Sequence, residues 1–174
     1  MKYRLRYNVM WLILPVWLAC THNEPRKAVT PAQPAPEVAA MEAVNKQLTE
    51  KDRDIMEAFI RRKGWAMQHS PDGYYVLILK EGEGPEVKEG SRVECRCTIR
   101  LLNGTLCYAQ QHRNFIVGRT DEIMGLHKAL LHLKKGTEAW FIFPPHLAYG
   151  LPGDRDKIPA RAILLFEVEL LQVS

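Results

Sequence analysis

The sequence predicts an α+β fold in which an antiparallel sheet wraps around one short helix, preceded by an N-terminal helix and a disordered tether. Three observations favour this fold class. Strand patterns dominate from residue 73 onward, one helical pattern interrupts them after residue 118, and a strongly apolar strand closes the chain. Strands on both sides of one helical segment place that helix against a single sheet.

The first residues have the plan of a secretory signal. Three basic side chains within the first six residues precede the apolar run 9–19 and then Cys20. The run is too short to cross a bilayer comfortably and contains Pro15, so a permanent transmembrane helix is the weaker interpretation. Leu-Ala-Cys at its end resembles a bacterial lipobox, which implies a lipoprotein signal peptide over residues 1–19 and lipidation of Cys20. Ordinary secretion with cleavage at the same place is the alternative.

The net charge of the chain predicts little about its function beyond this targeting signal. The formal net charge of the whole chain is +4, and it falls to about +1 without the three basic residues of the signal. No basic patch interleaved with aromatic residues remains, so we expect no nucleic-acid partner. Residues 20–37 hold four prolines among alanine, threonine and charged residues, which predicts a flexible tether.

An N-terminal helix is predicted over residues 38–64, with Gly64 as its stop. Its apolar residues recur at helical spacing between charged ones: Met41, Val44, Leu48, Ile55 and Phe59. Two interpretations stay open, a helix packed on its own domain and a helix that forms a homodimer or binds a partner. Lys51 interrupts a heptad seam, which favours the first.

Strand patterns follow over the predicted domain, residues 71–174. Residues 74–80 are β-branched and aromatic, and residues 92–101 alternate between an apolar and a charged face. Asn103-Gly104 is a strong hairpin signal, and residues 113–117 predict another short strand.

One helix and two strands complete the predicted domain. The buried stripe of the helix is Ile123, Leu126, Leu130 and Leu133, with Gly136 as its end. Residues 137–143 return to the sheet. In the last strand, residues 162–173, the inward side chains are Leu164, Phe166, Val168 and Leu170.

The stretch 141–150, Phe-Ile-Phe-Pro-Pro-His-Leu-Ala-Tyr-Gly, predicts the mouth of a pocket. Its strand stops at two prolines, because proline cannot donate to a sheet ladder. An aromatic rim ending in Tyr149 and the loop 151–158 then lead into the last strand. The alternative is an ordinary hairpin with a long loop.

These segments, with Lys157-Ile158-Pro159 and the ending 164–171, resemble the FK506-binding-protein-type (FKBP) peptidyl-prolyl isomerases. The resemblance implies an FKBP-like fold and catalysis of Xaa-Pro isomerisation on proline-containing polypeptide clients, without a cofactor or metal. The signal, tether, N-terminal helix and unusual first hairpin look most like the gliding-motility-associated isomerase lipoproteins of the bacterial envelope. That implies a lipid anchor and a location facing the periplasm.

The resemblance also implies roles for individual residues. Tyr149 matches the hydroxyl donor of the family, and Ile123 matches the position whose backbone N–H is the second donor; these two are the candidate catalytic residues. The candidate substrate-binding residues are Leu126, Ile158, Phe166, Phe115, Cys97, Cys107 and Tyr108. Ordinary core packing is the alternative for the apolar members of this set, whereas Tyr149 discriminates better.

Several positions depart from the family pattern. Cys97 and Cys107 replace aromatic residues, and Tyr108 replaces an aspartate. Arg113 falls near an aromatic wall position, with Phe115 as a substitute, and Asp154 replaces a flap histidine. These changes predict a wider and less aromatic pocket. A non-catalytic binding module and a structural lipoprotein spacer are therefore the alternatives to an isomerase.

The cysteines of the domain do not have metal-binding or redox-motif spacing. Cys95 and Cys97 form a Cys-x-Cys pair, and the six histidines are scattered, so we expect no metal site. Buried thiols that behave as small apolar side chains are the favoured state. A disulfide between Cys97 and Cys107 is the alternative in an oxidising compartment.

The lipobox resemblance gives a direct test of anchoring. Replacing the lipidated residue, Cys20→Ser, should release the protein from the membrane fraction, because the lipid is the expected anchor. Membrane-bound wild-type protein whose Cys20 is unmodified by mass spectrometry would contradict this prediction.

Overall fold

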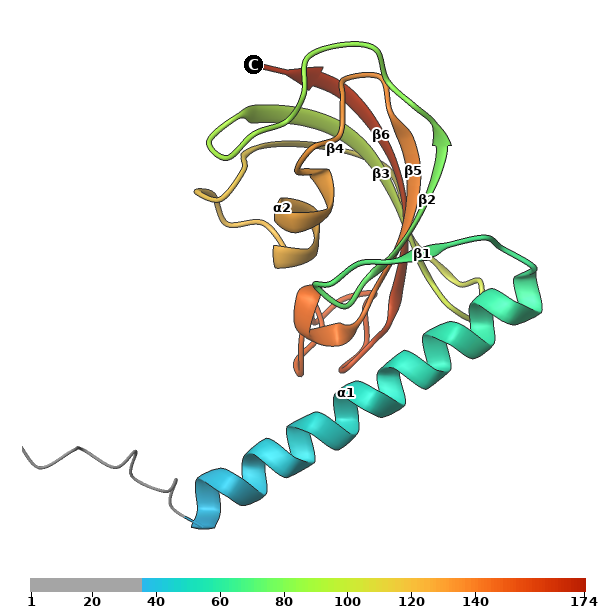
Figure 1. The fold of residues 1–174 in the computed structure, drawn as a ribbon, viewed down its shortest axis with the longest axis vertical. Coiled ribbons are helices and arrows are strands. Elements are labelled where there is room, and N and C mark those ends of the chain that lie inside the picture. The colour runs from blue at the N-terminus through green and yellow to red at the C-terminus, as the bar shows by residue number, and fades with distance from the viewer. Residues whose placement is uncertain (1–35) are drawn as a thin grey trace, which may run out of the picture. The chain divides into compact units, whose positions relative to one another are not determined.

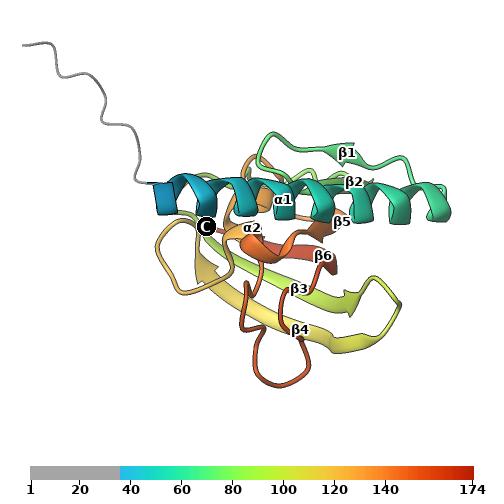
Figure 2. The same ribbon diagram turned by 90° about the horizontal axis from the view of Figure 1, so that it is seen from below.

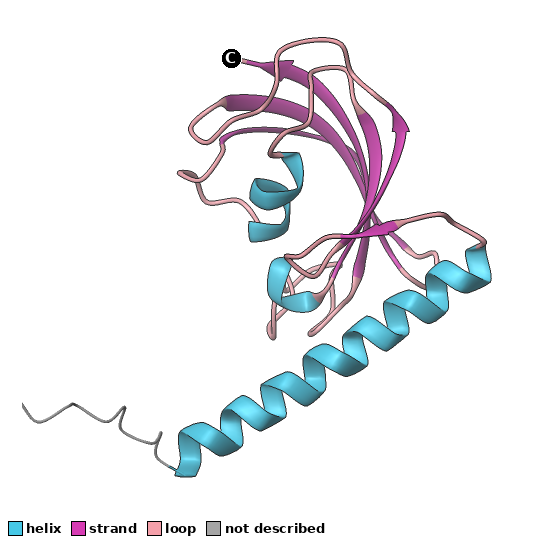
Figure 3. Ribbon diagram, in the orientation of Figure 1, coloured by secondary structure: helices cyan, strands magenta, loops and turns pink. Residues whose placement is uncertain are grey.

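The computed structural model describes residues 36–174, and in them one antiparallel sheet curves around a short helix (Figures 1 and 3). The helices are α1 (Pro36–Lys63), α2 (Met124–Leu130) and the 3-10 turn η1 (Pro145–Leu147). The strands are β1 (Gln68–His69), β2 (Tyr75–Lys80), β3 (Arg92–Leu101), β4 (Leu106–Ile116), β5 (Glu138–Phe143) and β6 (Leu164–Val173). The expected fold class is confirmed. The predicted signal peptide, Cys20 and nearly all of the tether lie outside the described residues.

The last strand is the centre of the sheet, whose order is β1-β2-β5-β6-β3-β4. Phe166 of β6 lies opposite Phe141 of β5 on one side and Ile99 of β3 on the other. The alternation predicted for β6 is present: Leu164, Phe166, Val168 and Leu170 are buried. The glutamates between them pair with arginines of β3 on the other face, Arg96 with Glu169 at 2.7 Å and Arg100 with Glu167 at 2.9 Å.

The main core fills the concave side of the sheet. Leu126 and Leu130 of α2 are fully buried there. Phe143 stacks on Phe141 with ring centroids 5.7 Å apart and meets Phe166 edge to face at 5.2 Å. These aromatic contacts join the end of β5 to the centre of β6, so they fix the start of the segment that carries Tyr149.

Two element boundaries differ from the sequence prediction. The short strand predicted at residues 113–117 is the end of β4, which begins at Leu106 and pairs with β3 along its length. The run Gln-Gln-His at 110–112 lacks apolar alternation, so pairing with β3 determines this strand and local pattern does not. Conversely, α2 ends at Leu130, because Leu131 has an extended ψ of 134° and His132 follows with a left-handed φ of 68°. Leu133 still packs on the core.

The N-terminal helix is present, but its buried face differs from the predicted one. Met41, Val44 and Ile55 are exposed, the first two by 66% and 54%. The residues that pack on the outer face of the sheet are Met56, Phe59 and Ile60, which contact Tyr75, Ile142 and Leu165. Figure 2 shows α1 lying across that face. The C-terminal half of α1 therefore packs on its own domain, and the homodimer stays a prediction.

Polar contacts add to this docking of α1. Tyr75 donates to Glu57 at 2.9 Å, and burial together with that carboxylate raises the pKa of Tyr75 to about 12. Near the middle of α1, the buried carboxylate of Asp52 pairs with Arg161 at 3.1 Å. No helix within residues 36–174 is long and apolar enough to cross a membrane.

The two halves of α1 should respond differently to mutation. Phe59 is only 3% exposed, so Phe59→Ala should lower the free energy of unfolding by about 3–5 kcal/mol. Met41→Ala removes a side chain that is already in water and should have an effect below about 0.5 kcal/mol. Urea denaturation of the two variants measures both values. Equal losses would show that α1 does not pack as described.

Candidate active site

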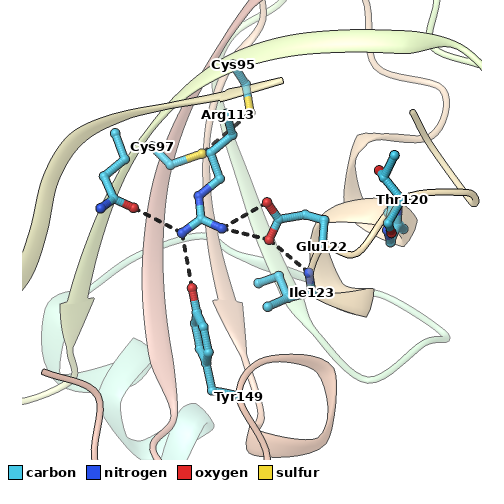
Figure 4. A network of polar contacts seen from close by, with 9 residues as sticks. Cys95, Cys97, Arg113, Thr120, Glu122, Ile123 and Tyr149 are labelled. Carbon is cyan, nitrogen blue, oxygen red and sulfur yellow. Dashed lines mark hydrogen bonds and ion pairs between the residues drawn. The ribbon is translucent and has the colours of Figure 1, made fainter. Parts of the chain in front are cut away.

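Three segments meet beside the N-terminal end of α2 (Figure 4). Arg113 comes from β4, and Tyr149 comes from the turn that follows η1. Glu122 and Ile123 precede α2, with Ile123 as its N-cap in an extended conformation. The residues predicted as the two donors, Tyr149 and Ile123, therefore belong to one site, together with an ion pair between them.

Arg113 is the hub of this site. Its Nη1 donates to both carboxylate oxygens of Glu122, at 2.7 and 2.8 Å. Its Nη2 donates to Gln111 Oε1 at 3.1 Å and to Tyr149 Oη at 3.0 Å (Figure 4). Four of the five N–H groups of the guanidinium are thereby used. The side chain has one orientation that satisfies all of these partners at once.

The ion pair is largely removed from water. The side chains of Arg113 and Glu122 are 17% and 10% exposed. Burial opposes the charge on Arg113, but the hydrogen bond and charge of Glu122 outweigh it, so the pKa of the guanidinium is raised above its ordinary value. Removing one partner would leave an uncompensated charge in a dry site, which is strongly destabilising.

The two predicted donors have different hydrogen-bond partners in this network. Tyr149 Oη accepts from Arg113, and no partner among residues 36–174 uses its hydroxyl proton, which remains free to be donated. The backbone N–H of Ile123 is already used, because it donates to Glu122 Oε1 at 2.8 Å. The expectation of two free donors is therefore wrong for Ile123, whose N–H becomes available only when Glu122 moves.

The residues predicted to bind substrate surround this network, but most of them are closed off. Tyr108, Tyr149 and Ile123 are partly accessible, whereas the apolar members are buried: Leu126, Phe166, Cys97, Phe115, Cys107 and Ile158. The wider pocket stays a prediction: Arg113 lies close to Cys95 and Cys97 (Figure 4), and the apolar members of the set are buried in the main core. What is open to solvent is the rim that carries Tyr149.

Two residues that depart from the family pattern, Tyr108 and Asp154, are hydrogen-bonded to each other. Tyr108 on β4 donates to Asp154 Oδ2 in the loop after Tyr149, at 2.5 Å. Asp154 Oδ1 accepts the backbone N–H groups of Asp156 and Ile158, at 2.9 and 2.8 Å. Burial opposes ionisation of Asp154, but these hydrogen bonds outweigh it and lower the pKa of the carboxyl. The pair fastens the loop 151–158 to β4.

The cysteines are free thiols, so the alternative of a disulfide between Cys97 and Cys107 is wrong. Cys97 Sγ lies 3.5 Å from Cys95 Sγ, and Cys107 Sγ donates to the Lys157 carbonyl at 3.6 Å. The hydrogen bond to Cys97 and burial raise the pKa of the Cys95 thiol, which therefore stays protonated. Within residues 36–174 no three histidine, cysteine or acidic side chains are grouped to hold a metal ion.

Comparison with known proteins identifies the family. Residues 84–171 match the sequence profile of the FKBP-type peptidyl-prolyl cis-trans isomerases. The chain belongs to that family. It is similar to FkpA, an FKBP-type isomerase of Buchnera aphidicola from Schizaphis graminum, with 32% identity over 122 residues. It is also similar to FK506-binding protein 4 of Rhizopus delemar, with 34% identity over 107 residues.

These similarities cover the isomerase domain but not the whole of the relatives. The alignments include 68% and 60% of this chain, and 47% of FkpA and 28% of the Rhizopus protein. Among solved structures, the isomerase of Pseudomonas syringae pv. tomato has a TM-score of 0.62 and 28% identity. That match covers 74% of this chain and 95% of the Pseudomonas chain. The FKBP-like fold is thereby confirmed, while the gliding-motility subtype stays a prediction.

Glu122 and Gln111 were not predicted from the sequence as residues of this site. Arg113 was noted only as a departure near an aromatic wall position, with Phe115 as the substitute. Glu122 precedes the predicted helix and has the opposite charge to Arg113, but the two are nine residues apart and lie in different elements. No helical or strand spacing joins them. Only the closure of β4 over the start of α2 shows that they pair.

The pairing of Tyr108 with Asp154 predicts a pH effect. Because the pKa of Asp154 is lowered in the folded state, its contribution to stability is present above the ordinary carboxyl pKa and is lost as pH falls through the lowered value. Tyr108→Phe should raise the pKa of Asp154 toward the ordinary value of about 3.9. It should also weaken the acid dependence of stability. NMR titration of the carboxyl measures the shift, with Tyr74→Phe as the control, and an unchanged pKa in Tyr108→Phe contradicts the role of Tyr108.

Proposed function

We propose that this protein is a peptidyl-prolyl cis-trans isomerase that assists the folding or assembly of envelope proteins. The observation that carries the proposal is Tyr149, whose hydroxyl has a free proton at the rim of an apolar floor in an FKBP-type domain. Rotation about an Xaa-Pro bond is slow because the amide must lose resonance as it twists, with a barrier of about 18–20 kcal/mol. A site that binds the twisted amide better than the planar one lowers that barrier.

The geometry suggests how each group would contribute. Tyr149 donates to a carbonyl beside the proline and holds it while the amide twists. The buried apolar residues, with Leu126 as the floor and Phe166 and Ile158 as walls, offer the proline ring a site without water. Opening of the rim is needed before the ring can reach them. No nucleophile takes part, because no covalent intermediate is required.

The location and partners follow from the N-terminal residues. A lipidated Cys20 and the tether 20–37 would hold the domain away from a membrane surface, facing the periplasm. Proline-containing envelope polypeptides are the proposed clients. The exposed Val38, Met41 and Val44 in the first half of α1 offer a second copy of the chain an apolar face, which supports the proposed homodimer.

A second function is favoured by the closed state of the site. The buried walls and the engaged Ile123 N–H suit a non-catalytic binding module of the same fold. Such a module would hold client segments on its surface, where a cavity of about 300 Å³ lies between α1 and the loop after Tyr149. Residues that line it include Leu48, His146 and Leu151. In that case peptide binding would occur without catalysis.

An exchange assay separates the two functions. The protein should accelerate cis/trans exchange of an Xaa-Pro peptide, measured by exchange NMR. Tyr149→Phe removes one neutral hydrogen bond, worth about 0.5–1.5 kcal/mol, so the rate should fall by about a few-fold to tenfold. Tyr75→Phe, on the outer face, is the matched control and should leave the rate unchanged. A folded wild type that leaves exchange at its uncatalysed rate would refute the isomerase function.

A further inference from the structure

We propose that Arg113 is a positioning residue of this site, which turns the Tyr149 hydroxyl so that its proton is presented to the substrate carbonyl. The inference rests on the proposed isomerase function. It gives a function to Arg113, a largely buried arginine near a position where the family has an aromatic residue and where the surrounding side chains are apolar. The alternative is an ion pair that serves only the stability of the domain.

The direction of the Arg113–Tyr149 hydrogen bond follows from the chemistry of the two groups. A guanidinium has only donors, whereas a phenol has one donor and can accept through its lone pairs. The contact of 3.0 Å between Arg113 Nη2 and Tyr149 Oη can therefore form only with arginine as the donor. The hydroxyl proton must point elsewhere, and among residues 36–174 no side chain or backbone carbonyl takes it.

The charge on Arg113 also changes the hydroxyl as a donor. Hydrogen bonds in a chain polarise one another, so a hydroxyl that accepts from a cation forms a stronger hydrogen bond through its own proton. The effect is greatest in a site with little water, and Arg113 is largely buried. A substrate carbonyl would then bind to a polarised hydroxyl whose orientation is already set.

Arg113 can act in this way because its other contacts fix it. Glu122 holds Nη1 through both oxygens, and Gln111 holds Nη2 beside Tyr149. Its backbone lies in β4, paired with Cys95 of β3. A lysine would bring the charge without the planar fork that joins Glu122 and Tyr149 simultaneously.

A double-mutant cycle tests whether Arg113 acts through Tyr149. Exchange kcat/KM is measured for the wild type, Arg113→Met, Tyr149→Phe and the double variant. We expect Arg113→Met to lower kcat/KM by about three- to tenfold in the wild type, and not to lower it in the Tyr149→Phe background. An equal loss in both backgrounds, or no loss in the wild type, overturns the inference. Arg113→Lys should give a value between those of wild type and Arg113→Met.

Folding is controlled in two ways. Arg113→Met leaves Glu122 buried without its cation, so if that variant does not fold, Arg113→Lys, which keeps the charge without the planar fork, takes its place in the cycle. Arg100→Met breaks the ion pair with Glu167 on the outer face of the same sheet, and it should change kcat/KM by less than about twofold. A comparable loss in Arg100→Met would assign the effect of Arg113 to stability and overturn the inference.

Failure of the inference is distinguishable from failure of the proposed function. A wild type without catalysis refutes the isomerase function and the role of Arg113 together. A catalysing wild type in which Tyr149→Phe and Arg113→Met reduce the rate by independent factors refutes the role of Arg113 alone.

Discussion

The buried ion pair between Arg113 and Glu122 is the interaction on which the arrangement of the site depends. Two charges leave water, and their mutual attraction offsets the cost only when the remaining donors and acceptors also find partners. Here Tyr149, Gln111 and the backbone N–H of Ile123 are those partners. The pair thus joins β4, the start of α2 and the turn after η1. Glu122 follows Arg113 by nine residues, whereas Tyr149 follows it by 36.

The ion pair explains why this site is largely buried although charged side chains, rather than apolar ones, occupy it. An apolar residue at position 113 could pack against the walls but could not hold a hydroxyl in a fixed direction. The charged network costs stability in desolvation, yet it gives the rim one hydrogen-bonded arrangement. The Tyr149 hydroxyl and the largely buried Arg113 and Glu122 belong to one hydrogen-bonded network.

The sheet that supports the site is covered on both faces at its centre. The concave face packs on α2, and the outer faces of β2, β5 and β6 pack under Met56, Phe59 and Ile60. This double coverage explains why Ile142 and Leu165, which point away from the main core, are apolar and buried. Both faces of β6 are therefore buried at its start. One face becomes partly exposed to solvent only where the glutamates of β6 pair with arginines of β3.

The sequence predicted the fold well because its signals were local. Alternation in β3 and β6, the Asn103-Gly104 turn and the leucines of α2 each fix an element without reference to distant residues. For the candidate site, the family resemblance named Tyr149 and the apolar set, which lie together in the structure, and their functional roles stay predictions. The pairs Arg113–Glu122 and Tyr108–Asp154 were not predicted, since no helical or strand spacing joins their members, and the second pair spans 46 residues. The buried face of α1 was misjudged for the same reason, because the choice between Ile55 and Met56 is made by the sheet.

The contact between Asp52 and Arg161 has a consequence for the order in which the protein forms. These residues are 109 positions apart, and α1 docks on strands that include β6, the last to be synthesised. Contacts of such large sequence separation form late, since the loop between them must close first. Met56 and Phe59 are thus synthesised before the strands on which they pack, and their side chains are buried late in folding. Until β6 is in place, the chain therefore carries apolar surface on α1 that the finished sheet covers.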